Sequence, residues 1–170
     1  MQNISELRVK YEKLQPINGV SEEMINKIQE SLSVEFPRDF YEIASFYGGG
    51  GLGAIDVHCF EHTSDDVNIV DETIKLRECV DVPQNFVVLA ELDESIIFMD
   101  TENLPAIIWC GFEDIHQLNK REFSTKPTVW NTFADFFKQL LDDEEHEISM
   151  YGPMNEIQEK YYDSSGTPYA

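Results

Sequence analysis

The stretch GVSEEMINKIQESLSVEFPRDFYEIASFYGGGGLG, residues 19–53, decides the fold because it contains two helix starts and a run of glycines. Ser21 is a good N-cap, and the acidic residues behind it suit the positive end of a helix dipole, so a helix is predicted to begin there. Pro37 suits the first turn of a further helix, which is predicted to stop at Gly48. The glycines that follow, up to Gly53, are expected to form a flexible hinge or a turn.

Apolar periodicity on both sides of this stretch predicts the remaining elements. Apolar residues at helical spacing predict a short N-terminal helix over residues 4–14. Thr132, with an acid three residues later, predicts the capped start of a final helix. Strands are predicted over four β-rich runs, residues 54–60, 85–91, 95–100 and 106–111. This order predicts an α+β fold, a mainly antiparallel sheet flanked by N-terminal helices and a C-terminal helix.

Acidic residues set two further boundaries. Asp65 and Asp66 are expected to cap a helix in the middle of the chain. The run DDEEHE, residues 142–147, is unfavourable at the negative end of a helix dipole, so the final helix is expected to fray or leave there. We therefore predict one domain over residues 1–147 and a C-terminal extension over residues 148–170, either packed on that domain or loose.

Composition favours a folded protein with a strongly acidic surface. The 170 residues are 42% hydrophobic and include 11 Phe and 7 Tyr, which is enough for a core, while the formal net charge is -21. Residues 51–119 alone hold 15 Asp or Glu against 2 Lys or Arg. Such a chain repels nucleic acid and anionic lipid and attracts a basic partner. The alternative is that the charge serves only solubility.

The cysteines and the N-terminus indicate the cellular compartment. Cys59, Cys79 and Cys110 are odd in number and widely spaced, so they do not predict a disulfide framework, and each is expected to be a small buried hydrophobe. The first residues lack the pattern of a signal peptide, and no run approaches the roughly 20 apolar residues of a membrane span. We therefore expect a cytoplasmic protein.

No motif in the sequence indicates catalysis or a cofactor. Gly48, Gly50 and Gly53 match G-x-G-x-x-G in letters, but they follow a predicted helix and precede a strand, which is the reverse of a dinucleotide site. His58 and His62 would lie about 13 Å apart on one strand, too far for one metal ion unless the strand ends first. We expect neither a cofactor nor a metal. A Cys–His nucleophile pair stays open, because its members can be distant in sequence.

The same stretch resembles the SUKH superfamily, in particular its Smi/Knr type, which is named after a fungal cell-wall assembly regulator. The residues that carry the resemblance are the capped start at 19–23, the step Phe36-Pro37, and the glycine run. Residues 132–137 are similar to the family's closing helix, so the resemblance covers residues 17–142. Phe where Leu is commoner and a longer glycine run depart from the pattern. The resemblance implies an α+β fold and no catalytic residues.

The resemblance implies that the protein binds another protein. Fungal members regulate cell-wall assembly through protein contacts, and bacterial members are mostly immunity proteins that neutralise a toxin, often a nuclease. A nuclease needs a basic cleft for phosphates, and an acidic surface can occlude that cleft. We therefore predict an immunity protein whose partner is a basic cognate toxin, with no direct contact to nucleic acid or membrane.

Two other functions and the contact residues complete the prediction. The alternatives are a non-catalytic regulatory scaffold of the cell-wall assembly regulator kind and an enzyme that uses His58 or a cysteine. The toxin is expected to contact acids in predicted exposed segments, namely Asp65, Asp66, Asp93, Glu94, Asp142, Asp143, Glu144 and Glu145.

Overall fold

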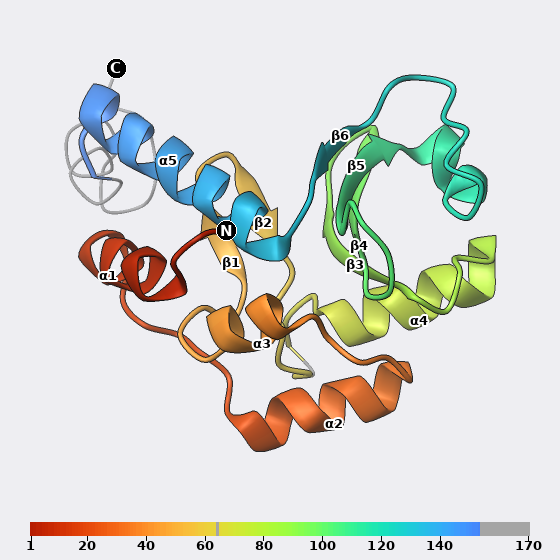
Figure 1. Cartoon of the computed structure of the whole chain (residues 1–170), viewed down its shortest axis with the longest axis horizontal. Helices are drawn as coiled ribbons and strands as arrows, with labels where there is room; N and C mark the ends of the chain where they lie inside the picture. The colour runs from red at the N-terminus through yellow and green to blue at the C-terminus, as the bar shows by residue number, and fades with distance from the viewer. Residues whose placement is uncertain (64, 154–170) are drawn as a thin grey trace.

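A computed structural model, which describes residues 1–63 and 65–153, confirms the predicted α+β class (Figure 1). Its helices are α1 (Ile4–Leu14), α2 (Glu22–Leu32), α3 (Arg38–Ala44), α4 (Ile69–Val80) and α5 (Phe133–Tyr151), with the 3-10 helix η1 (Phe112–Gln117). Its strands are β1 (Gly50–Leu52), β2 (Ile55–Val57), β3 (Phe86–Glu91), β4 (Ser95–Asp100), β5 (Ile107–Gly111) and β6 (Thr128–Trp130). β1 and β2 form one antiparallel sheet, and β3 to β6 form a second in sequence order.

Two helix starts lie where the sequence predicted them, and each has a side-chain cap. The hydroxyl of Ser21 accepts a hydrogen bond from the backbone N–H of Met24 at 3.2 Å, at the start of α2. The hydroxyl of Thr132 accepts one from the backbone N–H of Asp135 at 3.1 Å, at the start of α5. Each cap satisfies a backbone donor that has no partner inside its helix.

The start of α4 differs from the prediction. Its N-cap is Asn68, whose side-chain oxygen accepts from the backbone N–H of Asp71 at 2.9 Å, so the assignment of Asp65 and Asp66 as caps was wrong. Asn68 is buried, and its amide nitrogen also donates to the backbone carbonyl of Asp66 at 3.2 Å. An amide both accepts and donates, whereas a carboxylate only accepts, so Asn suits this buried position better.

The end of α3 lies earlier than predicted, at Ala44 instead of Gly48. The backbone N–H of Val20 donates to the carbonyl of Ala44 at 2.7 Å, so the segment before α2 takes a carbonyl that a longer helix would use. Gly19 makes this approach possible, since a Cβ there would lie 2.0 Å from the carbonyl oxygen of Ser45. The close crossing of the two segments therefore ends the helix.

The glycine run is a strand as well as a turn. Gly50 to Leu52 pair with Ile55–Val57, so the predicted hinge is in fact one arm of the β1–β2 hairpin. Gly49 has a φ of +91°, and a Cβ there would lie 2.4 Å from the carbonyl oxygen of His58. Glycine at this position lets the hairpin close on itself.

The main core is built from aromatic rings that both ends of the chain contribute. The ring centroid of Phe40 in α3 lies 4.7 Å from that of Phe133 in α5 and 4.8 Å from that of Phe60. The ring of Tyr47 lies 5.0 Å from that of Phe137 in α5. Pairs at such distances contribute about 0.5–1.5 kcal/mol each beyond their buried area. They hold α3 and the segment after it against α5.

Three strands of the four-stranded sheet, β3, β4 and β5, are buried on both faces. Alternating residues of β3 and β4 point to opposite sides, as the period of a strand requires. One face packs on the main core through Val87, Leu89, Ile97 and Met99. The other face packs against η1 and the residue that follows it. The residues in this second cluster include Val88, Ile96, Phe98, Ile108, Ile115 and Leu118. Figure 1 shows this sheet at one end of the molecule and the α1–α5 pair at the other.

A buried carboxylate organises the loop between β4 and β5. Asp100 is 2% exposed, and its Oδ2 pairs with Nη2 of Arg121 at 2.6 Å. Its Oδ1 accepts from the side-chain amide of Asn85 at 2.8 Å and from the backbone N–H of Glu102 at 2.9 Å. A buried charge is tolerated only when it is paired and hydrogen-bonded, so this network anchors the loop.

We expect Asp100→Ala to lower the free energy of unfolding by about 3 kcal/mol, because it leaves Arg121 without its ion pair and several donors without an acceptor. Chemical denaturation measures the loss. Glu102→Ala, an exposed change in the same loop, is the control and is expected to cost less than about 0.5 kcal/mol. Equal losses in the two variants would show that the Asp100 network does not hold the loop.

Candidate functional site

Acidic side chains occur on three segments that lie next to one another: β2 with the loop after it, the first turn of α4, and the end of β3 with the turn to β4. All are exposed except Glu72, which is partly buried. We call this set the acidic face; it consists of Asp56, Glu61, Asp65, Asp66, Asp71, Glu72, Glu91, Asp93 and Glu94.

Backbone hydrogen bonds bring these segments together. The N–H of His58 donates to the carbonyl of Leu89 at 2.8 Å, which joins the chain after β2 to β3. The N–H of Val88 donates to the hydroxyl of the buried Thr73 at 2.9 Å, which joins α4 to β3. Hydrogen bonds of the scaffold therefore hold the three segments next to one another.

At the centre of the acidic face lie His58, Glu72 and Glu91. One ring nitrogen of the histidine and one oxygen of each carboxylate all lie within 4.8 Å of one another. Burial lowers the pKa of His58, which Glu72 and Asp56 partly oppose by favouring the charged ring. Burial, together with a hydrogen bond shared with the carboxyl group of Glu72, raises the pKa of Glu91. Lys75 is the basic neighbour and donates to Glu72.

The sequence analysis missed this arrangement because it considered only neighbours in the chain. β2 ends at Val57, so His58 and His62 do not lie on one strand. His62 turns to Asp71, with 3.0 Å between Nε2 and Oδ1, while His58 faces Glu72 and Glu91. No spacing in the sequence indicates the group of His58, Glu72 and Glu91, since its members come from three separate segments of the chain.

Burial and nearby acids raise the pKa of two of the three cysteine thiols. Burial, followed by the charges of Asp66 and Asp56, raises the pKa of Cys59. Burial raises the pKa of Cys110 to about 12. The expectation that all three cysteines are buried is confirmed only for Cys110. Cys59 is half-buried, and Cys79 is exposed because it lies on the solvent side of α4. A thiol with a raised pKa holds little of the nucleophilic thiolate.

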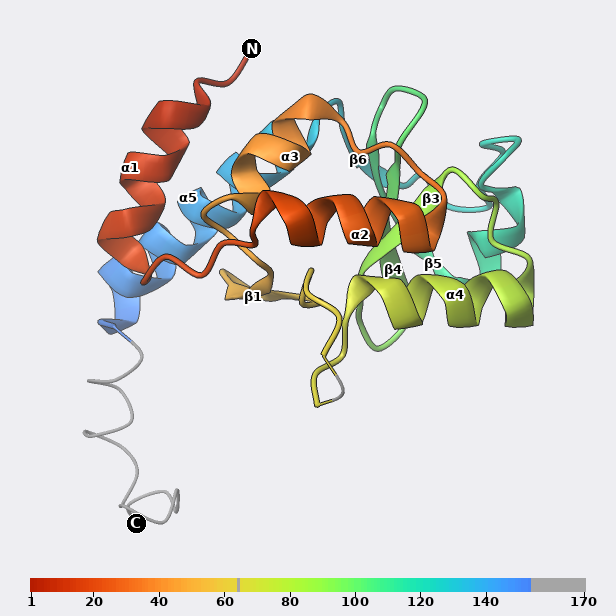
Figure 2. The ribbon, with the colours of Figure 1, turned by 90° about the horizontal axis from the view of Figure 1, so that it is seen from below.

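The predicted contact residues fall into two separate groups. Asp65 and Asp66 lie in the loop before α4, and Asp93 and Glu94 lie in the turn between β3 and β4; all four are exposed. Figure 2 shows that loop and that turn projecting toward the same side of the molecule. The third predicted segment, residues 142–145, lies on α5 instead.

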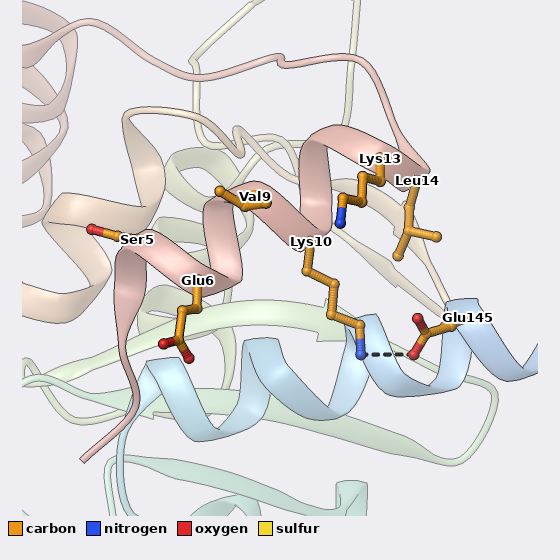
Figure 3. A pocket seen from close by; sticks show the side chains of 7 residues that line it. All are labelled: Ser5, Glu6, Val9, Lys10, Lys13, Leu14 and Glu145. Atoms are coloured by element: carbon orange, nitrogen blue, oxygen red, sulfur yellow. Dashed lines mark ion pairs between the residues drawn. The ribbon is translucent and has the colours of Figure 1, made fainter.

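The acids of α5 are engaged within the protein. Lys10 of α1 pairs with Asp142 at 2.6 Å and with Glu145 at 2.9 Å, as Figure 3 shows for the second pair. One oxygen of Glu144 accepts from the backbone N–H of Gly53 at 2.9 Å. Burial disfavours the charged forms of Lys10 and Asp142. The hydrogen bonds of Lys10 to Asp142 and Glu145 nevertheless raise the pKa of Lys10. The hydrogen bonds that Asp142 accepts from Lys10 and Lys138 lower the pKa of Asp142.

These contacts explain why α5 does not end in its acidic run. The helix continues to Tyr151, so the predicted fraying at residues 142–147 was wrong, and the helix crosses the predicted domain boundary at residue 147. The unfavourable charges near the end of the dipole are offset by cations from α1 and from within α5. Of the predicted extension over 148–170, residues 154–170 lie outside the described residues.

We expect Lys10→Met to lower the free energy of unfolding by about 1 kcal/mol at low ionic strength, because two partly exposed ion pairs between α1 and α5 are lost. Urea denaturation measures the effect, which should shrink in about 1 M salt because salt screens the pairs. Lys13→Met, at an exposed position in the same helix, is the matched control and should change stability by less than about 0.5 kcal/mol. A loss that is independent of salt would contradict the ion-pair explanation.

Comparison with known families agrees with this fold. A family model named SUKH_5, described as SMI1-KNR4 cell-wall, matches residues 1–142. The match confirms the resemblance drawn from residues 17–142 and extends it through α1. Among the described residues, no helix is long and apolar enough to cross a membrane.

Proposed function

Since this chain belongs to the SUKH family, which includes toxin immunity proteins and cell-wall regulators, we propose that it is an immunity protein that neutralises a cognate toxin. The partner is a basic protein. A nuclease is the class we propose, because its active site is a basic cleft that an acidic surface can occlude. The acidic face occludes the partner's basic cleft. Partner and inhibitor meet in the cytoplasm, where a nuclease would find nucleic acid.

The observation that carries this proposal is the acidic face itself. Its exposed carboxylates come from three scaffold-held segments, so the backbone that carries them needs little ordering on binding. Its basic neighbour, Lys75, already pairs with Glu72. A surface of one sign steers an oppositely charged partner and raises its association rate. The acids of α5, which pair with Lys10, contribute less.

The proposal includes no catalytic activity. Burial raises the pKa of Cys59 and that of Cys110, so neither thiol is activated as a nucleophile. The family resemblance also implies no catalytic residues. A binding role therefore explains the acidic face better than an enzyme that uses His58 or a cysteine.

A regulatory scaffold without a toxin partner is the second candidate, and the family description, SMI1-KNR4 cell-wall, favours it. Co-expression with the product of the adjacent gene separates the two. An immunity protein restores the growth of cells that express the toxin and co-purifies with it. A scaffold does neither, and that result would reject the immunity proposal.

We expect the double change Asp93→Lys and Glu94→Lys to slow association with the toxin by about tenfold or more at low ionic strength, because it reverses charge in the acidic face. Stopped-flow mixing of the purified proteins measures the rate.

The matched control is Glu30→Lys with Glu35→Lys, which changes the net charge equally at exposed positions on and after α2. It should slow association by no more than about twofold, since it lies outside the acidic face. Equal slowing by both pairs would mean that only net charge matters, and an association rate that ignores salt would contradict electrostatic steering.

A further inference from the structure

We propose that His58, Glu72 and Glu91 form a binding site for a divalent transition-metal ion of the zinc class. Imidazole nitrogen and carboxylate oxygen are both ligands of Zn²⁺, and the three candidate atoms all lie within 4.8 Å of one another. This inference does not depend on the immunity function. It also departs from the expectation of no metal, which rested on the spacing of His58 and His62 and on the lack of paired cysteines.

Small side-chain movements would bring the ligands to coordinating distance. Bonds of about 2.0–2.1 Å in a tetrahedral zinc site place two ligand atoms about 3.3 Å apart. Glu91 is exposed and can rotate, while the backbone of His58 is fixed by its hydrogen bond to Leu89 at 2.8 Å. Glu72 precedes Thr73, whose hydroxyl ties α4 to β3. The scaffold therefore fixes the three backbone positions and leaves the side chains to adjust.

The histidine ring provides a second, independent observation. Nε2 of His58 is buried and has no hydrogen-bond partner in the structure. A buried polar atom without a partner lowers the stability of the folded state. Coordination through this nitrogen would remove that cost, whereas a purely structural histidine in a core is normally hydrogen-bonded.

The charges and the donor set together favour a zinc-class ion over other cations. Two carboxylates, from Glu72 and Glu91, balance a double positive charge. Ca²⁺ and Mg²⁺ prefer shells made only of oxygen, so the imidazole of His58 favours Zn²⁺ and similar ions. Lys75 pairs with Glu72 and therefore competes with a metal ion for that carboxylate. Three protein ligands leave at least one coordination position for water or a partner's side chain.

Calorimetric titration of the full chain with ZnCl₂, after treatment with a chelator and dialysis, tests the site. We expect one Zn²⁺ per chain and a rise in melting temperature with added zinc, because the ion binds the folded state. Co²⁺ should give visible absorption bands that disappear in His58→Ala, which reports the imidazole ligand directly. An absence of saturable binding to one site per chain would overturn the proposal.

Variants separate this site from general attraction of cations to an acidic protein. His58→Ala, Glu72→Gln and Glu91→Gln should each weaken zinc binding by about tenfold or more. Loss of a residue that only hydrogen-bonds to a metal ligand already lowers metal affinity by about 10–100-fold. Glu91 is exposed, so its variant keeps the test valid if His58→Ala does not fold. The controls are His62→Ala and Glu94→Gln, a nearby histidine and a nearby acid, which should leave zinc affinity unchanged.

Lys75→Met gives a test in the opposite direction. Removing this ammonium frees Glu72 and takes away a positive charge beside the ion, so zinc should bind more tightly than to the unchanged chain. Weaker or equal binding in this variant, or equal losses in the ligand variants and the controls, would refute the assignment of these three residues.

Discussion

The packing of aromatic rings from α3, α5 and the loop after β2 is the constraint on which the rest of the fold depends. Phe40, Phe60 and Phe133 meet at centroid distances of 4.7–6.4 Å, although residue 133 lies 73 positions beyond residue 60. Tyr47 and Phe137 extend the same cluster at 5.0 Å. These rings are almost fully buried, so their area and mutual contacts bring the last helix back onto the first third of the chain.

This packing also decides what happens to the acidic residues. Once Phe133 and Phe137 hold α5 in place, Asp142 lies opposite Lys10 and becomes part of the scaffold. Burial of Phe60 has a different effect on its neighbours. It anchors the chain, while the half-buried His58 and the exposed acids around it lie beside β3. The same core thus places one acidic segment against a lysine of α1 and leaves the other exposed at the surface.

Local features of the sequence predicted local structure well. Ser21 and Thr132 cap their helices as predicted, and the hairpin of β3 and β4 was found from its two apolar runs, because caps and alternation act over a few residues. Errors arose where a distant segment decides. α3 ends at Ala44 because the chain before α2 takes its carbonyl, and α5 continues because Lys10, more than 130 residues away, pairs with Asp142. η1 and β6 carried too weak a local pattern to be predicted.

The same distinction explains how much of the site could be predicted. Exposure of Asp93 and Glu94 follows from a polar turn between apolar strands, whereas the approach of His58 to Glu72 and Glu91 follows only from how β2, α4 and β3 pack. Like charges held close together destabilise a folded chain. With 33 acidic and 12 basic residues, the protein cannot pair them all internally. Any cation, protein or metal, that binds this face offsets that repulsion and stabilises the fold in proportion to its affinity.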